Sequence, residues 1–167
     1  MSNAKFSIPD PENEPILSYQ PGSPERKELK EALGKLSGET IEIPLIIGGK
    51  EVRTGNLGKC VMPHDHQHVM ATYHKAGPKE VEAAIEASQE AWKSWSIMPW
   101  WERASIFKKM ASLLSGPWRA TLGAATMLGQ SKNVFQAEID TPCELIDFLN
   151  FNTKYMEAIY EQQPLSP

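Results

Sequence analysis

In the second half of the chain apolar positions recur with the period of a helix, whereas in the stretch before it they form short runs typical of strands. Two such runs flank Gly48-Gly49, and paired glycines supply the positive φ angles of a tight hairpin turn. Further strand-like runs cover residues 59–62 and 68–74, with a polar turn between them. We therefore interpret residues 41–76 as a small β meander.

The helical second half is divided into several expected helices. The first begins at Pro78 and carries its apolar residues along one face. These residues are Val81, Ala84, Ile85, Ser88, Trp92 and Trp95. Prolines at positions 99 and 117 interrupt the pattern, because a proline removes a helical hydrogen bond. A second helix is therefore predicted between these prolines, and a third from about Trp118 to Leu128.

A last helical region is predicted to extend to about residue 160. Gly129 lies just before it and is interpreted as the C-cap of the preceding helix. Pro142 lies inside this region, so we expect a break or kink there rather than one straight helix. Thr141 and Glu144 have the spacing of a capping box, a pattern typical of a helix start.

The N-terminal segment is rich in proline and poor in apolar anchors. Its prolines are Pro9, Pro11, Pro15 and Pro21. Each proline removes an amide donor and restricts the residue before it, so we expect residues 1–22 to form an extended arm. Ser23 and Pro24 then favour the start of a short surface helix, which Gly38 ends. With helices over 78–160, the expected fold class of this stretch is α+β.

The composition is typical of a globular chain, and the net charge argues against some classes of partner. Of 167 residues, 41% are hydrophobic, which argues against disorder. The chain has 17 basic and 21 acidic residues and a net charge of -4, so neither nucleic acid nor an anionic membrane is expected as its main partner. Its longest apolar stretch is much shorter than the roughly 20 residues that cross a bilayer.

The cysteines and the N-terminus bear on the compartment. Cys60 and Cys143 are too few and too far apart for a disulfide-stapled secreted domain, so we expect a reducing compartment. The N-terminal sequence has neither an apolar signal region nor an arginine-rich amphipathic stretch. We therefore expect a cytoplasmic protein, with the mitochondrial matrix as the alternative if a presequence has been removed.

Closely spaced histidines raise the possibility of a metal site. They are His64, His66 and His68, with His74 nearby. On a strand, alternate residues share one face, where paired imidazoles can hold zinc or copper. Pro63 and Asp65 favour a polar surface turn instead, and no further ligand follows at a recognisable spacing. We prefer the surface turn and keep metal binding as the alternative.

A glycine pair superficially resembles a phosphate-binding loop. Gly123 and Gly129 enclose five residues and Gln130 follows, with Lys132 two positions later. The phosphate-loop pattern requires four residues between its glycines and a lysine directly after the second one. We therefore predict no nucleotide site in this stretch.

Two further groups of residues are interpreted as packing elements. Four tryptophans lie within ten residues at a helix–helix corner, where large rings favour core packing over stacking on sugars or bases. They are Trp92, Trp95, Trp100 and Trp101. Cys60 lies in a strand-like run and Cys143 in a helical stretch, neither within a nucleophile motif. We interpret both cysteines as small buried hydrophobes.

Several sequence blocks resemble a known family. The earlier blocks are Glu14-Pro-Ile-Leu-Ser-Tyr, Gln20-Pro-Gly-Ser-Pro-Glu-Arg, Ile46-Ile47-Gly48-Gly49 and Pro63-His64-Asp65-His66. The more specific blocks are Arg103-Ala-x-Ile-Phe-x-Lys, Leu114-Ser-Gly-Pro, Met127-x-Gly-Gln-x-Lys-x-Val-x-Gln-Ala-Glu-Ile-Asp, Glu144-Leu-Ile-Asp-Phe-x-x-Phe-Asn and Gln163-Pro. Together they resemble the Δ1-pyrroline-5-carboxylate dehydrogenase branch of the aldehyde dehydrogenases over nearly the whole chain from Glu14.

The resemblance implies an α/β parent fold with a Rossmann-type cofactor domain, of which residues 23–167 would form an incomplete N-terminal part. It also implies oxidation of L-glutamate γ-semialdehyde to L-glutamate with NAD in proline degradation, in a homodimer or higher homo-oligomer. In such enzymes a cysteine thiolate attacks the aldehyde and hydride passes to the nicotinamide. Water activated by a glutamate then releases the acid, and an asparagine helps to stabilise the oxyanion.

This chain departs from the family because it stops at Pro167, before the family's cofactor strand and its catalytic cysteine, glutamate and asparagine. Gly129-Gln130 leads into Ser131-Lys132 with no cysteine, so it is not the nucleophile motif. We therefore assign no catalytic, NAD-contacting or metal-binding residue here and expect the stretch alone to be inactive. The alternative is a truncated, non-catalytic isoform that binds full-length subunits.

Overall fold

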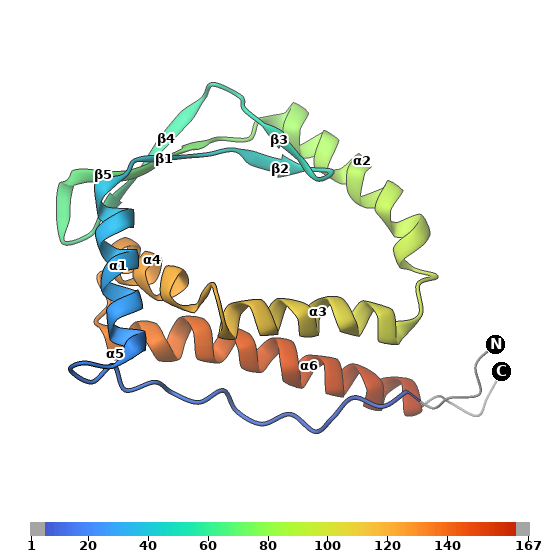
Figure 1. Ribbon diagram of the computed structural model, residues 1–167. Coiled ribbons are helices and arrows are strands. Elements are labelled where there is room, and N and C mark those ends of the chain that lie inside the picture. Colours follow the sequence, from blue (N-terminus) through green and yellow to red (C-terminus); the bar gives the residue numbers. More distant parts are fainter. Residues whose placement is uncertain (1–5, 163–167) are drawn as a thin grey trace.

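The computed structural model describes residues 6–162, so Gln163-Pro164 and the first five residues of the arm lie outside the description. The helices are α1 (Pro24–Gly38), α2 (Pro78–Trp95), α3 (Trp100–Ser115), α4 (Arg119–Gln130), α5 (Val134–Glu138) and α6 (Glu144–Glu161), and a π-helical segment, η1, spans Ile139–Cys143. The strands are β1 (Ile41–Ile43), β2 (Leu45–Ile47), β3 (Lys50–Val52), β4 (Leu57–Met62) and β5 (Asp65–His74). Figure 1 shows these elements arranged as a ring, with the strands opposite α3 and α6 and with α2 joining the two sides.

The short surface helix predicted to start at Ser23 and Pro24 is confirmed as α1. The Ser23 hydroxyl accepts a hydrogen bond from the amide of Arg26 at 3.4 Å, and Pro24 occupies the first helical position. Leu29 on this helix is buried with Tyr19 and Ala124, which joins α1 to α4. This small apolar cluster therefore anchors the start of the helix region to the arm.

The predicted strands are also present, but they pair differently from a simple meander. β1 pairs in parallel with β5, and β4 pairs with β5 in antiparallel fashion. β2 and β3 form a separate hairpin across Gly48-Gly49, with φ angles of 57° and 75°. Pro44 lies between β1 and β2 and has no amide hydrogen to donate, so the ladder is interrupted there and the strands divide into two sheets.

The expected helix breaks are confirmed, but the two predicted helix caps, at Thr141 and at Gly129, are not formed as expected. The kink at Pro142 is the π-helical segment η1, through which the helical backbone continues into α6. No new helix start is needed, and the predicted capping box is wrong: the Thr141 hydroxyl lies 2.8 Å from that of Thr126. Gly129 is not a C-cap either, because α4 continues to Gln130 and Ser131 takes the left-handed conformation with φ 56°.

Two expectations of burial are wrong. Core packing was predicted for the four tryptophans of residues 92–101, yet Trp92 is 67% exposed, Trp95 and Trp101 are 36% and 37% exposed, and Trp100 is half-buried. Cys60 is exposed on β4, whereas Cys143 is buried as expected. Both errors arise because burial depends on what packs against a helix or strand, and in this chain no buried residue is found on α2. Among residues 6–162 no helix is long and apolar enough to span a bilayer.

Candidate functional site

The N-terminal arm meets α4, α5 and η1 at a buried ionic cluster. Glu138 is 1% exposed, and its carboxylate accepts hydrogen bonds from the amide of Leu17 at 2.9 Å and the hydroxyl of Tyr19 at 2.7 Å. Arg119 donates to the same carboxylate, to that of Glu14 and, at 2.8 Å, to the carbonyl of Pro15. One buried guanidinium thus fastens the arm to two helical elements.

The electrostatics of the cluster favour a structural role over catalysis. Burial by itself would raise the pKa of Glu138, but the hydrogen bonds from Arg119, Leu17 and Tyr19 outweigh it and hold this pKa below its ordinary value. Burial, together with the neighbouring Glu138 carboxylate, raises the pKa of Tyr19. Burial also raises the pKa of the Cys143 thiol to about 11, so this cysteine is protonated at neutral pH and is a poor nucleophile, as expected.

Farther along α6, more charged side chains hold the arm. Asp147 accepts from the amide of Glu14 and from the side chain of Asn13, both at 2.7 Å. The carboxylate of Glu157 accepts from the amide of Ile8 at 3.1 Å, and Lys154 donates to the carbonyl of Ile8 at 2.8 Å. The arm therefore runs along α6, as Figure 1 shows, held by helix side chains instead of a β ladder.

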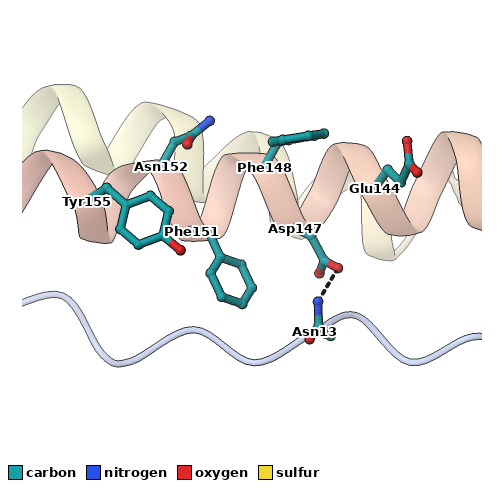
Figure 2. A pocket seen from close by; sticks show the side chains of 7 residues that line it. All are labelled: Asn13, Glu144, Asp147, Phe148, Phe151, Asn152 and Tyr155. Carbon is teal, nitrogen blue, oxygen red and sulfur yellow. Dashed lines mark hydrogen bonds between the residues drawn. The ribbon is translucent and has the colours of Figure 1, made fainter.

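A pocket of about 320 Å³ lies between the arm and α6 (Figure 2). Its lining combines aromatic rings with amides and carboxylates. The residues are Asn13, Glu144, Asp147, Phe148, Phe151, Asn152 and Tyr155. Figure 2 shows the Asn13 side chain reaching Asp147, whose two oxygens each accept one bond from the arm. Both oxygens of this carboxylate are therefore occupied, and the described lining contains no cysteine, serine or histidine that could act as a nucleophile or base.

The histidines do not come together as a metal site. Among residues 6–162 no group of three histidine, cysteine, aspartate or glutamate side chains could hold a metal ion. His64 lies 2.7 Å from the hydroxyl of Ser131, which ties the β4–β5 turn to the end of α4. His74 is buried and accepts from the amide of Gly55 at 3.1 Å, so its Nε2 carries the proton and donates to Glu42 at 3.0 Å. The surface-turn interpretation is supported for His64.

The stretch that resembles a phosphate loop is structural as well. Gly123 is buried in the middle of α4, where Leu29 of α1 packs against it. Lys132 pairs with Asp140 at 2.5 Å across the bend between α4 and η1. These contacts explain both residues by packing and by charge pairing.

Sequence reasoning missed the residues that fasten the arm. Arg119, Glu138, Asp147 and Glu157 are charged residues on helices, and each contacts a partner more than 100 positions away. The available signal was the position of Glu138 between the apolar residues Ala137 and Ile139. A charge at such a position indicates a buried partner but does not say which one.

Comparison with known proteins identifies the family. The model of the aldehyde dehydrogenase family matches residues 52–166. The chain belongs to the aldehyde dehydrogenase family. This aldehyde dehydrogenase chain is 51% identical over 162 residues to the Δ1-pyrroline-5-carboxylate dehydrogenase of Agaricus bisporus, a match that covers 96% of the chain and 30% of the relative. A second relative, the mitochondrial enzyme of the same name from Dictyostelium discoideum, is 47% identical over 96% of the chain and 29% of its own length.

Solved structures support the same family. The NAD-bound Δ1-pyrroline-5-carboxylate dehydrogenase from Mycobacterium tuberculosis superimposes with a TM-score of 0.95 at 44% identity, covering 99% of this chain and 31% of that one. A mutant of the Thermus thermophilus enzyme gives a TM-score of 0.87 at 30% identity, over 97% of this chain and 31% of that chain. The expected fold class is confirmed, and the aldehyde dehydrogenase chain spans about 30% of the length of these relatives.

Proposed function

We propose that the chain is the N-terminal part of an NAD-dependent dehydrogenase that oxidises L-glutamate γ-semialdehyde, formed from 1-pyrroline-5-carboxylate, to L-glutamate in proline degradation. The observation that carries the proposal is the 51% identity with the Agaricus bisporus enzyme over 96% of the chain. The NAD-bound Mycobacterium tuberculosis enzyme, which shares the backbone at a TM-score of 0.95, supports NAD as the cofactor.

Within such an enzyme, residues 23–167 would contribute to the cofactor domain as scaffold. The arm, α4 and α5 are joined by buried ionic contacts, and burial raises the pKa of the Cys143 thiol. We therefore assign the nucleophilic cysteine, the glutamate base, the oxyanion asparagine and the NAD contacts of the proposed reaction to polypeptide beyond residue 167.

The test compares two proteins made from the source gene. The first ends at Pro167, and the second follows the reading frame past that codon to its stop codon. With glutamate γ-semialdehyde and NAD, we expect NADH formation from the longer protein and none from residues 1–167. NADH formation from residues 1–167 would refute the division of roles, and an inactive, folded longer protein would refute the proposed activity.

A second candidate role is a truncated isoform that binds full-length subunits. The observation that favours it is the apolar surface of the isolated chain, on which Trp92 and Ile97 are 67% and 82% exposed. This role predicts that tagged residues 1–167 retain full-length enzyme from the same cell. Recovery of the tagged chain without any full-length subunit would contradict it.

The compartment and the assembly belong to the whole protein. The relatives from Dictyostelium discoideum and Homo sapiens carry the word mitochondrial in their names, which favours the mitochondrial alternative over the cytoplasm. For the whole protein we propose mitochondrial residence and a homo-oligomer. Imaging of the full-length protein with a C-terminal fluorescent tag tests the first, and light scattering of the purified enzyme tests the second.

A further inference from the structure

The chain exposes far more surface than a compact protein of its mass. Its accessible surface is 11666 Å². A compact monomer of 18.7 kDa exposes about 8,300 Å², so the surplus is roughly 3,400 Å². A standard protein interface takes only about 800 Å² from each partner. The surplus therefore corresponds to several ordinary interfaces.

Part of this surplus is a continuous apolar face on α2 and α3, which we call the α2–α3 face. On α2, side chains at helical spacing form a stripe in which Val81, Ile85 and Trp92 are each more than half exposed. The stripe continues onto α3 through Trp95, whose ring meets the ring of Phe107 edge-on at 6.5 Å between centroids.

The opposite side of α2 is polar, so the helix has a defined orientation toward a partner. Glu82, Glu86 and Glu90 follow one another at four-residue spacing away from the stripe, and all three are exposed. A helix that displays such a pattern but has no buried residue has an apolar side without a partner. The partner must be apolar where it meets Trp92 and must leave the glutamates in solvent.

The length of the relatives indicates what covers this face. The structural match with the Mycobacterium tuberculosis enzyme covers 99% of this chain but only 31% of that enzyme, with a TM-score of 0.95. The same backbone thus exists within a chain about three times as long, and the additional polypeptide is sufficient to cover the surplus. A second copy of this chain is a poorer fit, because a standard interface would leave most of the surplus exposed. A full-length subunit is also a poorer fit, since its own N-terminal segment already occupies the equivalent place.

We propose that the α2–α3 face is a docking surface for the polypeptide that forms the remaining two thirds of a dehydrogenase subunit, and that this polypeptide binds the chain even when supplied as a separate molecule. The inference rests on the proposed function for the identity of the partner. It predicts an enzyme assembled from two chains without a covalent link. It also predicts that full-length subunits do not bind at this face.

The experiment co-expresses tagged residues 1–167 with the part of the Agaricus bisporus enzyme that follows its matched segment. In the reference pair, the same part is co-expressed with the matched Agaricus segment in place of residues 1–167. The full-length Agaricus enzyme is a further control, which we expect not to bind the tagged chain. We measure the soluble yield of the untagged partner, its co-elution with the tagged chain by light scattering, and NADH formation. We expect a one-to-one complex.

Matched substitutions on α2 locate the interface. Trp92→Glu places a charge in the centre of the stripe and should lower the recovered complex at least about tenfold, because a buried unpaired charge opposes association. Trp92→Phe should restore most of it. Ala83→Glu adds the same charge on the exposed polar side of α2 and should change the yield less than about twofold. Circular dichroism checks that each variant keeps its helices.

Each outcome decides one question. Failure of residues 1–167 to solubilise or retain the partner overturns the inference, whether or not the reference pair assembles, and so does a complex that is indifferent to Trp92→Glu. Retention of the full-length enzyme at the same face would also overturn it. A one-to-one complex without NADH formation, beside an active full-length control, supports the docking surface and contradicts the proposal that the chain is part of an NAD-dependent dehydrogenase.

Discussion

At the scale of single residues, the buried carboxylate of Glu138 joins segments that are far apart in sequence. It contacts Leu17 and Tyr19 of the arm and Arg119 of α4. Removal of one partner from a buried ion pair is costly, because the other charge remains in a poorly solvating environment. The cluster therefore makes the fold sensitive to one conservative change.

We expect Glu138→Gln to lower the free energy of unfolding by about 3 kcal/mol, since it leaves Arg119 with less compensation at nearly the same side-chain volume. Urea unfolding of the longer protein that continues past Pro167, followed by circular dichroism, measures the effect. The control is Glu31→Gln, because Glu31 is exposed and lies 4.0 Å from its partner Lys27. Equal unfolding midpoints for the two variants would contradict the role of the cluster.

The same carboxylate predicts an acid dependence of stability. The pKa of Glu138 lies below its ordinary value of 4.5 in the folded chain, so the unfolded chain binds the proton more tightly. The stabilisation is complete above the ordinary pKa and is lost as the pH falls through the folded pKa. We expect the urea midpoint to be constant above about pH 5.5 and to fall below it. The urea midpoint of Glu138→Gln should depend less on pH than that of the unmodified protein. Parallel pH profiles of the two proteins would refute the assignment of the acid dependence to Glu138.

At the scale of elements, local sequence signals predicted most helices and strands but not their partners. Ser23 and Pro24 specify the start of α1 by local bonding, and Gly48-Gly49 specifies a hairpin in the same way. The pairing of β1 with β5 joins residues 30 positions apart in parallel register, which local patterns do not encode. For the same reason, the sequence could not show that carboxylates on α6 bind the arm.

The arm should loosen locally when its central bond is removed. Asp147→Leu deletes two hydrogen bonds to a charged acceptor, so the amide of Glu14 should exchange with deuterium at least about tenfold faster. Glu144→Leu is the control, since Glu144 lines the same pocket and makes no bond to the arm within the described residues. Hydrogen exchange measured by mass spectrometry would contradict the assignment if both variants protected the arm equally.

At the scale of the whole molecule, burial was the least predictable property. Tryptophan favours the interior, yet Trp92 and Trp118 remain exposed. Burial depends on which elements pack together in space, and helical periodicity in the sequence does not specify those neighbours. The apolar pattern placed the apolar side chains of α2 on one face, but it did not indicate that this face is exposed.

The isolated chain should consequently behave as an incompletely packed protein. Its exposed surface includes the apolar α2–α3 face, and a monomer usually tolerates a contiguous apolar patch of only a few hundred Å², so we expect aggregation or molten behaviour with strong binding of a hydrophobic dye. Sedimentation and dye fluorescence measure these properties, with the reconstituted complex as the control. A sharp cooperative melt from a monodisperse monomer would contradict the expectation.

The prolines of the arm affect how the chain meets other chains. Pro9, Pro11 and Pro15 have no amide hydrogens, and the amides of Ile8 and Leu17 are already bound by carboxylates of the helix region. An extended segment with few free donors is a poor template for an additional β-strand. Although the chain exposes much apolar surface, its longest extended segment therefore gives little support to amyloid-like stacking, and aggregates are expected to form through the helices.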